Sequence, residues 1–182
     1  MRAFIAIDLP FNIKNKIRQI QTRLKSSEIS AKWIKPENIH LTLKFLGNIE
    51  ENQINEIENI IKETTYISKP FQVSFNNFGF FPNPKKPKVF FISLTDESTL
   101  KKFTNILEEK LEKLGFKKEK RFEAHITLAR IKNITNITNL VKEINNISFK
   151  KSFSINEIIL FRSTLTQSGP IYAKVFSSSL TD

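Results

Sequence analysis

Segments with two different spacings of hydrophobic residues follow one another along the chain, and their order predicts an α+β fold. Apolar residues at every second position indicate strands, whereas spacings of three and four residues indicate amphipathic helices. Strands are expected over residues 2–8, 32–35, 39–45, 71–78, 88–94, 123–129, 153–161 and 171–176. Helices are expected over residues 13–24, 54–61 and 98–114 and around Leu140, with Ser98 capping the third helix and Gly115 ending it.

The strand over residues 39–45 shows the clearest alternation. Its apolar face, which we expect in the core, consists of Ile39, Leu41, Leu43 and Phe45. The opposite face carries His40, Thr42 and Lys44, and a solvated position is the expectation for Lys44. This strand therefore presents an imidazole and a hydroxyl side by side, roughly 7 Å apart.

A second copy of this pattern occurs later in the chain. The two copies contain both histidines of the protein and read His40-Leu41-Thr42-Leu43 and His125-Ile126-Thr127-Leu128. The histidines are 85 residues apart, and the same shift places the predicted elements of one half on those of the other. We therefore expect one domain over residues 1–182 with an internal duplication, roughly 1–82 and 88–176. A pseudo-twofold arrangement would place the two His-x-Thr faces opposite each other across a cleft.

Two facing His-Thr pairs have the chemistry that in-line displacement at phosphorus requires. The usual pKa of imidazole, about 6.5, allows one ring to be protonated while the other is neutral near physiological pH. One histidine then accepts a proton from the attacking water while the other donates one to the departing oxygen. The threonine hydroxyls are expected to hold the non-bridging phosphate oxygens. This scheme requires no metal ion.

Other kinds of site fit the sequence less well. A two-histidine zinc site lacks a third ligand, because the chain has no cysteine and no third histidine, and the polar triplet that begins at each motif histidine contains no acid. The sequence contains no G-x-S-x-G signal of a Ser-His-Asp triad, and nothing resembles a glycine-rich nucleotide loop. The net charge of +11 supports a nucleic-acid ligand, although a lysine-rich composition explains it equally well. The lack of cysteine favours a cytoplasmic protein.

Several side chains near the motifs are candidates for holding the ligand. Arg130 follows His125 by five residues and would bind phosphate, and Lys44, on the face of His40, is a second candidate for the same role. Strict alternation places Arg130 on the opposite face, so it reaches the cleft only if the strand ends or bulges there. The aromatic residues considered for stacking on a base are Phe4, Phe45, Phe80, Phe81 and Tyr172. Because the chain has 17 phenylalanines and most must lie in the core, none of these is assigned.

The segments around the two motifs resemble a known family. The matching segments are R-A-F-I-A-I-D-L-P, W-I-K-P-E-N-I-H-L-T-L-K-F-L-G, F-G-F-F-P-N-P-K-K-P-K-V-F-F-I, A-H-I-T-L-A-R and S-T-L-T-Q-S-G-P-I-Y. They are similar to the RNA 2',3'-cyclic phosphodiesterases of the two-histidine (2H) phosphoesterase superfamily, also called 2'-5' RNA ligases. The resemblance implies a bilobal α+β fold with two pseudo-symmetric lobes. Each lobe would have an antiparallel sheet flanked by helices, with the active-site cleft between the sheets.

The resemblance also implies a role for each motif residue. His40 would be the proton donor, His125 the proton acceptor, and Thr42, Thr127 and Arg130 the phosphate-binding residues. The implied reaction is hydrolysis of RNA 2',3'-cyclic phosphate ends to 2'-phosphate, with no metal or cofactor. The alternatives are 2'-5' RNA ligation in the same cleft and a non-catalytic module that binds RNA ends. We expect a monomer that does not contact membranes, with tRNA fragments among the candidate substrates.

One segment departs from the pattern of this family. Its members usually have Arg-Pro directly before the second histidine, where this chain has Glu123-Ala124. The difference affects how the second motif strand begins, and it leaves the histidine and threonine positions unchanged. Arg121 and Lys120 are the basic residues expected to compensate for it.

Overall fold

The fold is taken from a computed structural model, which describes residues 1–26, 29–95, 97–119, 121–134 and 137–181. The first half of the chain forms β1 (Arg2–Asp8), α1 (Phe11–Leu24), β2 (Ile29–Trp33), the 3-10 turn η1 (Pro36–Asn38), β3 (His40–Asn48), α2 (Glu51–Tyr66) and β4 (Phe71–Phe81). The second half forms β5 (Val89–Thr95), α3 (Glu97–Lys113), β6 (His125–Ile134), α4 (Ile137–Asn145), β7 (Ser152–Ile155), β8 (Glu157–Thr166) and β9 (Gly169–Ser179).

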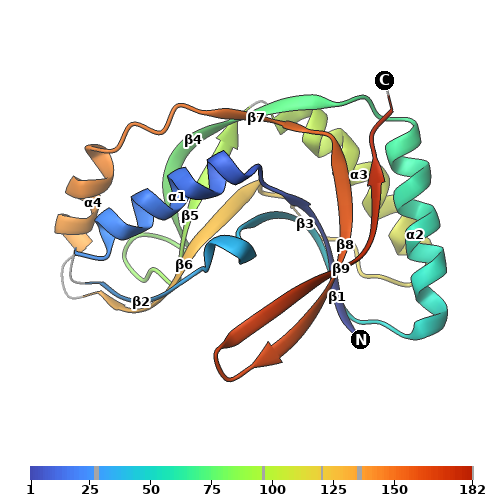
Figure 1. The fold of residues 1–182 in the computed structure, drawn as a ribbon, viewed down its shortest axis with the longest axis horizontal. Coiled ribbons are helices and arrows are strands. Elements are labelled where there is room, and N and C mark those ends of the chain that lie inside the picture. The colour runs from blue at the N-terminus through green and yellow to red at the C-terminus, as the bar shows by residue number, and fades with distance from the viewer. Residues whose placement is uncertain (27–28, 96, 120, 135–136, 182) are drawn as a thin grey trace.

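Within the described residues, the strands form two antiparallel sheets. Sheet A has the strand order β3-β1-β8-β9, and sheet B has the order β2-β6-β5-β4-β7. The helices α2 and α3 lie at sheet A, and α1 and α4 lie at sheet B (Figure 1). The predicted α+β fold with two lobes is confirmed.

Each sheet contains two strands from the other half of the chain, which are β8 and β9 in sheet A and β2 and β4 in sheet B. In sheet A, β8 pairs with β1, and in sheet B, β4 pairs with β5. A shift of 85 residues relates β3, β1 and β8 to β6, β5 and β4, in the same spatial order. The two lobes are therefore not the two halves of the sequence, because their third strands are exchanged.

Two local predictions are wrong. The expected single strand over residues 153–161 is two strands, because β7 pairs with β4 in sheet B whereas β8 pairs with β1 in sheet A. The chain crosses between the sheets at Asn156, whose carbonyl accepts a hydrogen bond from the Leu180 amide. Ser98 does not cap α3, because that helix already begins at Glu97. Gly115 does follow the end of α3, with a positive φ of 88° that suits glycine.

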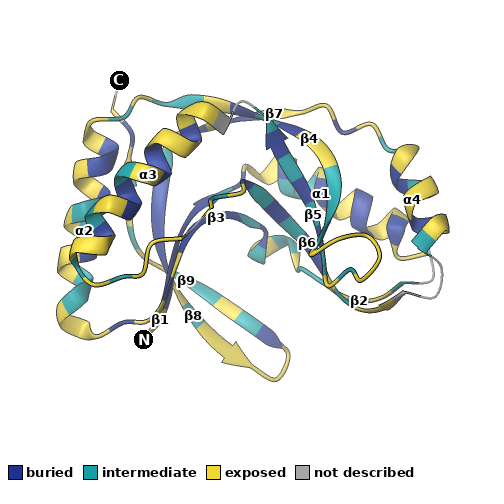
Figure 2. Cartoon of the chain, turned by 180° about the vertical axis from the view of Figure 1, so that it is seen from behind, coloured by how far each residue is buried: buried dark blue, intermediate teal, exposed yellow. Residues whose placement is uncertain are grey.

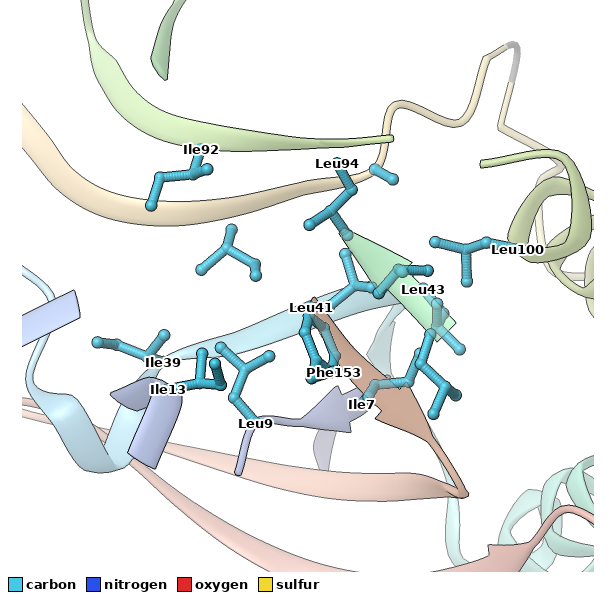
Figure 3. Close-up of a cluster of buried hydrophobic side chains, with 14 of the residues drawn as sticks. Ile7, Leu9, Ile13, Ile39, Leu41, Leu43, Ile92, Leu94, Leu100 and Phe153 are labelled. Carbon is cyan, nitrogen blue, oxygen red and sulfur yellow. The ribbon is translucent and has the colours of Figure 1, made fainter. Parts of the chain in front are cut away.

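The hydrophobic core lies directly behind the two motif strands. The side chains of Leu41 and Leu43 on β3 point into the same cluster as Ile92 and Leu94 on β5 (Figure 3). On β6, Ile126 and Leu128 are fully buried in this cluster as well. Burial of each such side chain contributes roughly 1.5–3 kcal/mol, so the backbones that carry the histidines are firmly anchored. The helices turn their buried faces toward the sheets and leave their outer faces exposed (Figure 2).

Candidate active site

The two histidines begin β3 and β6 and have the same local hydrogen bond. Nδ1 of His40 lies 2.8 Å from the carbonyl oxygen of Asn38, and Nδ1 of His125 lies 2.7 Å from that of Glu123. A carbonyl oxygen only accepts, so each Nδ1 must carry the proton and donate it. In both rings Nε2 is therefore the nitrogen that is available to gain or lose a proton.

One cavity of about 680 Å³ contains both motifs. It brings together all five residues predicted for the site, namely His40, Thr42, His125, Thr127 and Arg130. Further cations on its wall are Arg2, Lys32 and Lys35, and none of the described lining residues is Asp or Glu. A cavity with this charge pattern attracts anions, and the phosphates of nucleic acid are a suitable class.

A β-bulge brings Arg130 into the cavity. In the pairing of β5 with β6, Phe91 lies opposite Thr127 and Phe90 lies opposite Ala129, so Leu128 is the extra residue. Leu128 and Ala129 are both buried, and Arg130 consequently returns to the face that carries His125. The sequence predicted that Arg130 would reach the cleft only if the strand ended or bulged there, and the strand bulges.

A similar bulge in β3 overturns two predictions. Ile5 lies opposite Lys44 and Ala6 opposite Thr42, which leaves Leu43 as the extra residue. Phe45 is therefore not in the core but 61% exposed on the cavity wall. Lys44 is not solvated but 2% exposed, since the inserted residue turns it to the face opposite His40.

Lys44 is held by partners on and after α3. Its ammonium lies 2.7 Å from the Glu108 carboxylate and also donates to the carbonyl oxygen of Lys117. Glu108 is buried too, so each charge depends on the other. The pair fixes β3 of sheet A to the helix behind it and takes no part in the cavity.

His40 is enclosed by aromatic rings. The ring centroids of Phe4 and Tyr172 lie 4.8 and 5.3 Å from that of His40, and Phe161 lies at 6.4 Å. Desolvation by this burial lowers the pKa of His40 to about 4, against the opposing effects of the Asn38 hydrogen bond and the Asp8 carboxylate. Lys14 and His125 lower it further by smaller amounts. In the unliganded protein, His40 is therefore neutral at pH 7.

The aromatic candidates fall into three groups. Phe4, Phe45 and Tyr172 line the cavity, and burial raises the pKa of the Tyr172 hydroxyl, opposed by Arg130 and Arg2. Phe81 lines a second cavity beside His125 and lies edge-on to that ring at 5.0 Å. Phe80 instead packs on Phe90 at 5.2 Å, against the core, and is not part of the site.

Some cavity residues were missed by the sequence analysis. Lys32 and Lys35 flank Trp33 just before the first motif, and this basic run was the available signal for them. The side-chain amide of Asn38 donates to the Pro170 carbonyl oxygen at 2.8 Å, which ties the start of β9 to the segment that holds His40. No local sequence signal relates Asn38 to Pro170. Lys120, considered as a compensating residue, lies outside the described residues, and Arg121 pairs with Glu123 at 3.2 Å.

The described residues contain neither a metal-binding cluster nor a membrane-spanning helix. No group of three or more His, Asp or Glu side chains in the described ranges is arranged to hold a metal ion. In the same part of the chain, no helix combines the length and the apolar character that crossing a membrane requires.

Comparison with known proteins shows the family of the chain. The sequence model of the family LigT like Phosphoesterase matches residues 7–91 and again residues 92–172. The chain belongs to this family. A family member from Archaeoglobus fulgidus, named RNA 2',3'-cyclic phosphodiesterase, is 38% identical over 173 residues, covering 94% of this chain and 96% of the relative. One of the same name from Methanothermobacter thermautotrophicus is 34% identical over 175 residues, covering 94% and 95%.

Solved structures of LigT-like proteins have the same fold. A crystal structure of a Thermus thermophilus protein superposes with a TM-score of 0.84 at 27% identity, covering 99% of this chain and 98% of the other. The E. coli LigT complexed with 3'-AMP superposes with a TM-score of 0.82 at 22% identity, covering 100% and 98%. The bilobal LigT-like arrangement therefore extends over the entire chain.

Proposed function

We propose that this chain hydrolyses 2',3'-cyclic phosphate ends of RNA to 2'-phosphate. The observation that carries the proposal is the presence of two His-x-Thr faces in one cavity, with cations and no described carboxylate on its wall. The name RNA 2',3'-cyclic phosphodiesterase, given to relatives that align with nearly the entire chain, supports the same reaction.

In the proposed mechanism, the two imidazoles exchange protons through Nε2. The oxygen of a water molecule attacks phosphorus, and its proton passes to Nε2 of His125. The bond from phosphorus to O3' breaks, and O3' takes the proton from Nε2 of His40. The backbone carbonyls at Nδ1 hold both rings in the required tautomer throughout.

The low pKa of His40, about 4, bears directly on its role as proton donor. A donor must be protonated, whereas His40 of the unliganded protein is neutral at pH 7. The negative charge of a bound phosphodiester favours the protonated ring and raises its pKa. We infer that His40 gains its proton when the substrate binds, and that burial then makes it a strong acid toward O3'.

The remaining cavity side chains would hold the phosphate and the RNA. Thr42, Thr127 and Arg130 supply donors for the non-bridging oxygens, whose charge grows in the transition state. Arg2 and the two lysines around Trp33 provide the positive field for the RNA backbone. Candidate substrates include tRNA fragments, and the chain would act as a monomer in the cytoplasm, a compartment that suits a protein without cysteine.

The direct test is the product formed from an oligonucleotide that ends in a 2',3'-cyclic phosphate, with EDTA present. Chromatography separates 2'-phosphate, 3'-phosphate and unreacted ends. We expect the 2'-phosphate, because His40 is assigned to protonate O3'. Formation of the 3'-phosphate would reverse the assigned orientation, and loss of turnover in EDTA would contradict the metal-independent scheme.

The same assay separates the two alternatives. Tight binding of cyclic phosphate ends without any product would identify a module that only holds RNA ends. Addition of an RNA with a 5'-hydroxyl tests for 2'-5' joining, in which this hydroxyl replaces water as the nucleophile, phosphorus forms a bond to O5', and the bond to O3' breaks as before.

A further inference from the structure

A second cavity of about 350 Å³ lies on the other side of His125. Of the described residues that line the two cavities, His125 alone is common to both. The second cavity lies over β4 and β5, where Ser93 is opposite His125 and Phe91 is opposite Gly79. Its occupant would touch His125 without filling the space at His40.

The walls of the second cavity combine aromatic rings with basic groups. Its half-buried aromatic residues are Phe78, Phe81, Phe91 and Phe122. Lys101 and Arg121 supply positive charge, and Glu123 is paired with Arg121. Stacking surfaces with cations at the rim are the features by which proteins hold single-stranded RNA. The volume lies in the lower range of small-molecule pockets and suits a single nucleotide.

The aromatic wall depends on a glycine. A Cβ atom on Gly79 would lie 2.4 Å from Cζ of Phe91, so only glycine allows this ring to lie over β4 in its present position. Phe91 stacks on Phe81 with ring centroids 4.1 Å apart and planes at 20°. Both rings also lie edge-on to His125, at 5.5 and 5.0 Å.

Core packing does not account for these two rings. Phe81 and Phe91 belong neither to the hydrophobic clusters nor to the half-buried side chains packed against them. Their neighbours Phe80 and Phe90 supply the core contacts of the same strands. Two stacked phenylalanines are therefore held at a cavity wall, where a ligand with an aromatic face would contact them.

We propose that the second cavity binds one nucleotide of RNA, in addition to the nucleotide that carries the reacting phosphate. Its base would pack against the stacked pair that Phe81 and Phe91 form, and its phosphate would lie toward Lys101 and Arg121. Two sources have this chemistry: the penultimate nucleotide of the cyclic-phosphate strand, and the first nucleotide of a second strand with a 5'-hydroxyl. The inference rests on the proposed function, because it takes RNA as the ligand of the cleft.

Calorimetric binding to unreactive ligands tests the proposal. The ligands are 2'-UMP, the dinucleotide UpU with a terminal 2'-phosphate, and plain UpU added to protein saturated with 2'-UMP. The Phe91→Leu variant keeps an apolar side chain and removes the stacking face, and Phe11→Leu makes the same change at a ring that is exposed at the start of α1. Arg121→Ala, with the exposed Arg18→Ala as its control, forms a second pair.

If the cavity binds a nucleotide, Phe91→Leu should weaken one of the two UpU ligands about tenfold more than it weakens 2'-UMP. Loss of affinity for the phosphorylated dinucleotide would identify the bound nucleotide as the penultimate one of the cyclic-phosphate strand. Loss of affinity for plain UpU would identify it as the first nucleotide of a second strand. The proposal is overturned if Phe91→Leu weakens all three ligands equally, or if it acts no differently from Phe11→Leu. Because binding is measured without turnover, a protein that shows the expected pattern but hydrolyses no cyclic phosphate contradicts the proposed function and not the subsite.

Discussion

The two histidine sites share one backbone design and differ in what surrounds it. In both, a histidine begins a strand, a threonine follows two residues later, and a bulge after the threonine changes the alternation. The first residue to return to the cavity is Phe45 in sheet A and Arg130 in sheet B, at positions 85 residues apart. The same backbone geometry thus presents an apolar ring on one side and a guanidinium on the other.

The rings around the histidines differ as well. Phe4, Phe161 and Tyr172 enclose His40, and this burial lowers its pKa to about 4. His125 contacts Phe81 and Phe91 at their edges and borders two cavities. The comparison shows that equal motifs can have unequal surroundings. In the proposed mechanism the enclosed ring, His40, becomes the donor only after the bound phosphodiester has favoured its protonation.

We propose that the two halves, roughly residues 1–82 and 88–176, arose by internal duplication. The family sequence model matches the chain twice, over residues 7–91 and 92–172. Equivalent strands in equivalent spatial order, with bulges at equivalent positions, support the proposal.

The largest expected effect comes from removing either imidazole. His40→Ala and His125→Ala should each lower kcat on a cyclic-phosphate-ended oligonucleotide by about 100- to 10,000-fold, because each removes one proton-transfer group. Initial rates from product chromatography measure the change. A His125→Ala protein with full activity would be incompatible with paired acid–base catalysis.

The next largest effect is a loss of stability on substitution of Lys44, the residue before Phe45. Lys44→Ala leaves the buried Glu108 carboxylate without its partner, which should lower the free energy of unfolding by about 3–5 kcal/mol. Lys110→Ala removes an exposed partner of Glu63 and should cost about 1 kcal/mol or less. Urea denaturation compares the two variants. Equal losses would show that burial of the Lys44 pair has no energetic consequence.

The contrast between Arg130 and Phe45 can be measured directly. Arg130→Ala should lower kcat/KM by about 100-fold, since it removes a donor to the charge that develops on phosphate. Phe45→Ala at the equivalent position should mainly raise KM, about tenfold, through loss of an apolar contact. Steady-state kinetics separate the two, with Arg18→Ala as a control on an exposed arginine. A pure KM effect at Arg130 would place its contribution in ground-state binding.

The last expected effect is a change of stability with pH. The pKa of His40 in the folded protein, about 4, lies below its usual value near 6.5, so the unfolded chain binds the proton more readily between these values. Stability should therefore fall as pH is lowered from about 6.5 to 4, by at most roughly 3 kcal/mol. Unfolding curves at several pH values measure the slope. His40→Gln should remove this contribution, and His125→Gln should retain it.

Local patterns predicted the motif pairs because both lie in regular parts of the strands. His40 and Thr42 share a face of β3, and His125 and Thr127 share one of β6, so period two holds until each bulge. Beyond the bulge, the pattern failed at Lys44 and Phe45. Lys44 is a charged residue in a buried position, and its alternation with apolar neighbours gave no sign of Glu108, which lies 64 positions later in the chain.

The exchanged strands could not be predicted from either half alone. β4 has buried residues at alternate positions in its first half, and β8 begins with a run of four buried apolar residues, from Ile158 to Phe161. Both patterns indicate strands, and neither specifies a pairing partner. The break at Asn156 is likewise a consequence of pairing, because β7 and β8 join different sheets. Such features depend on contacts between residues far apart in the chain, and the hydrophobic pattern of one segment does not indicate those contacts.

The exchange of β4 and β8 also constrains how the protein forms. Sheet A, which carries His40, needs β8 and β9 from the end of the chain, so the lobe cannot close until synthesis is nearly complete. A fragment that stops in the loop after β4 contains neither sheet in full. Two fragments cut in that loop would have to assemble like the subunits of an intertwined dimer, each supplying two strands to the sheet of the other.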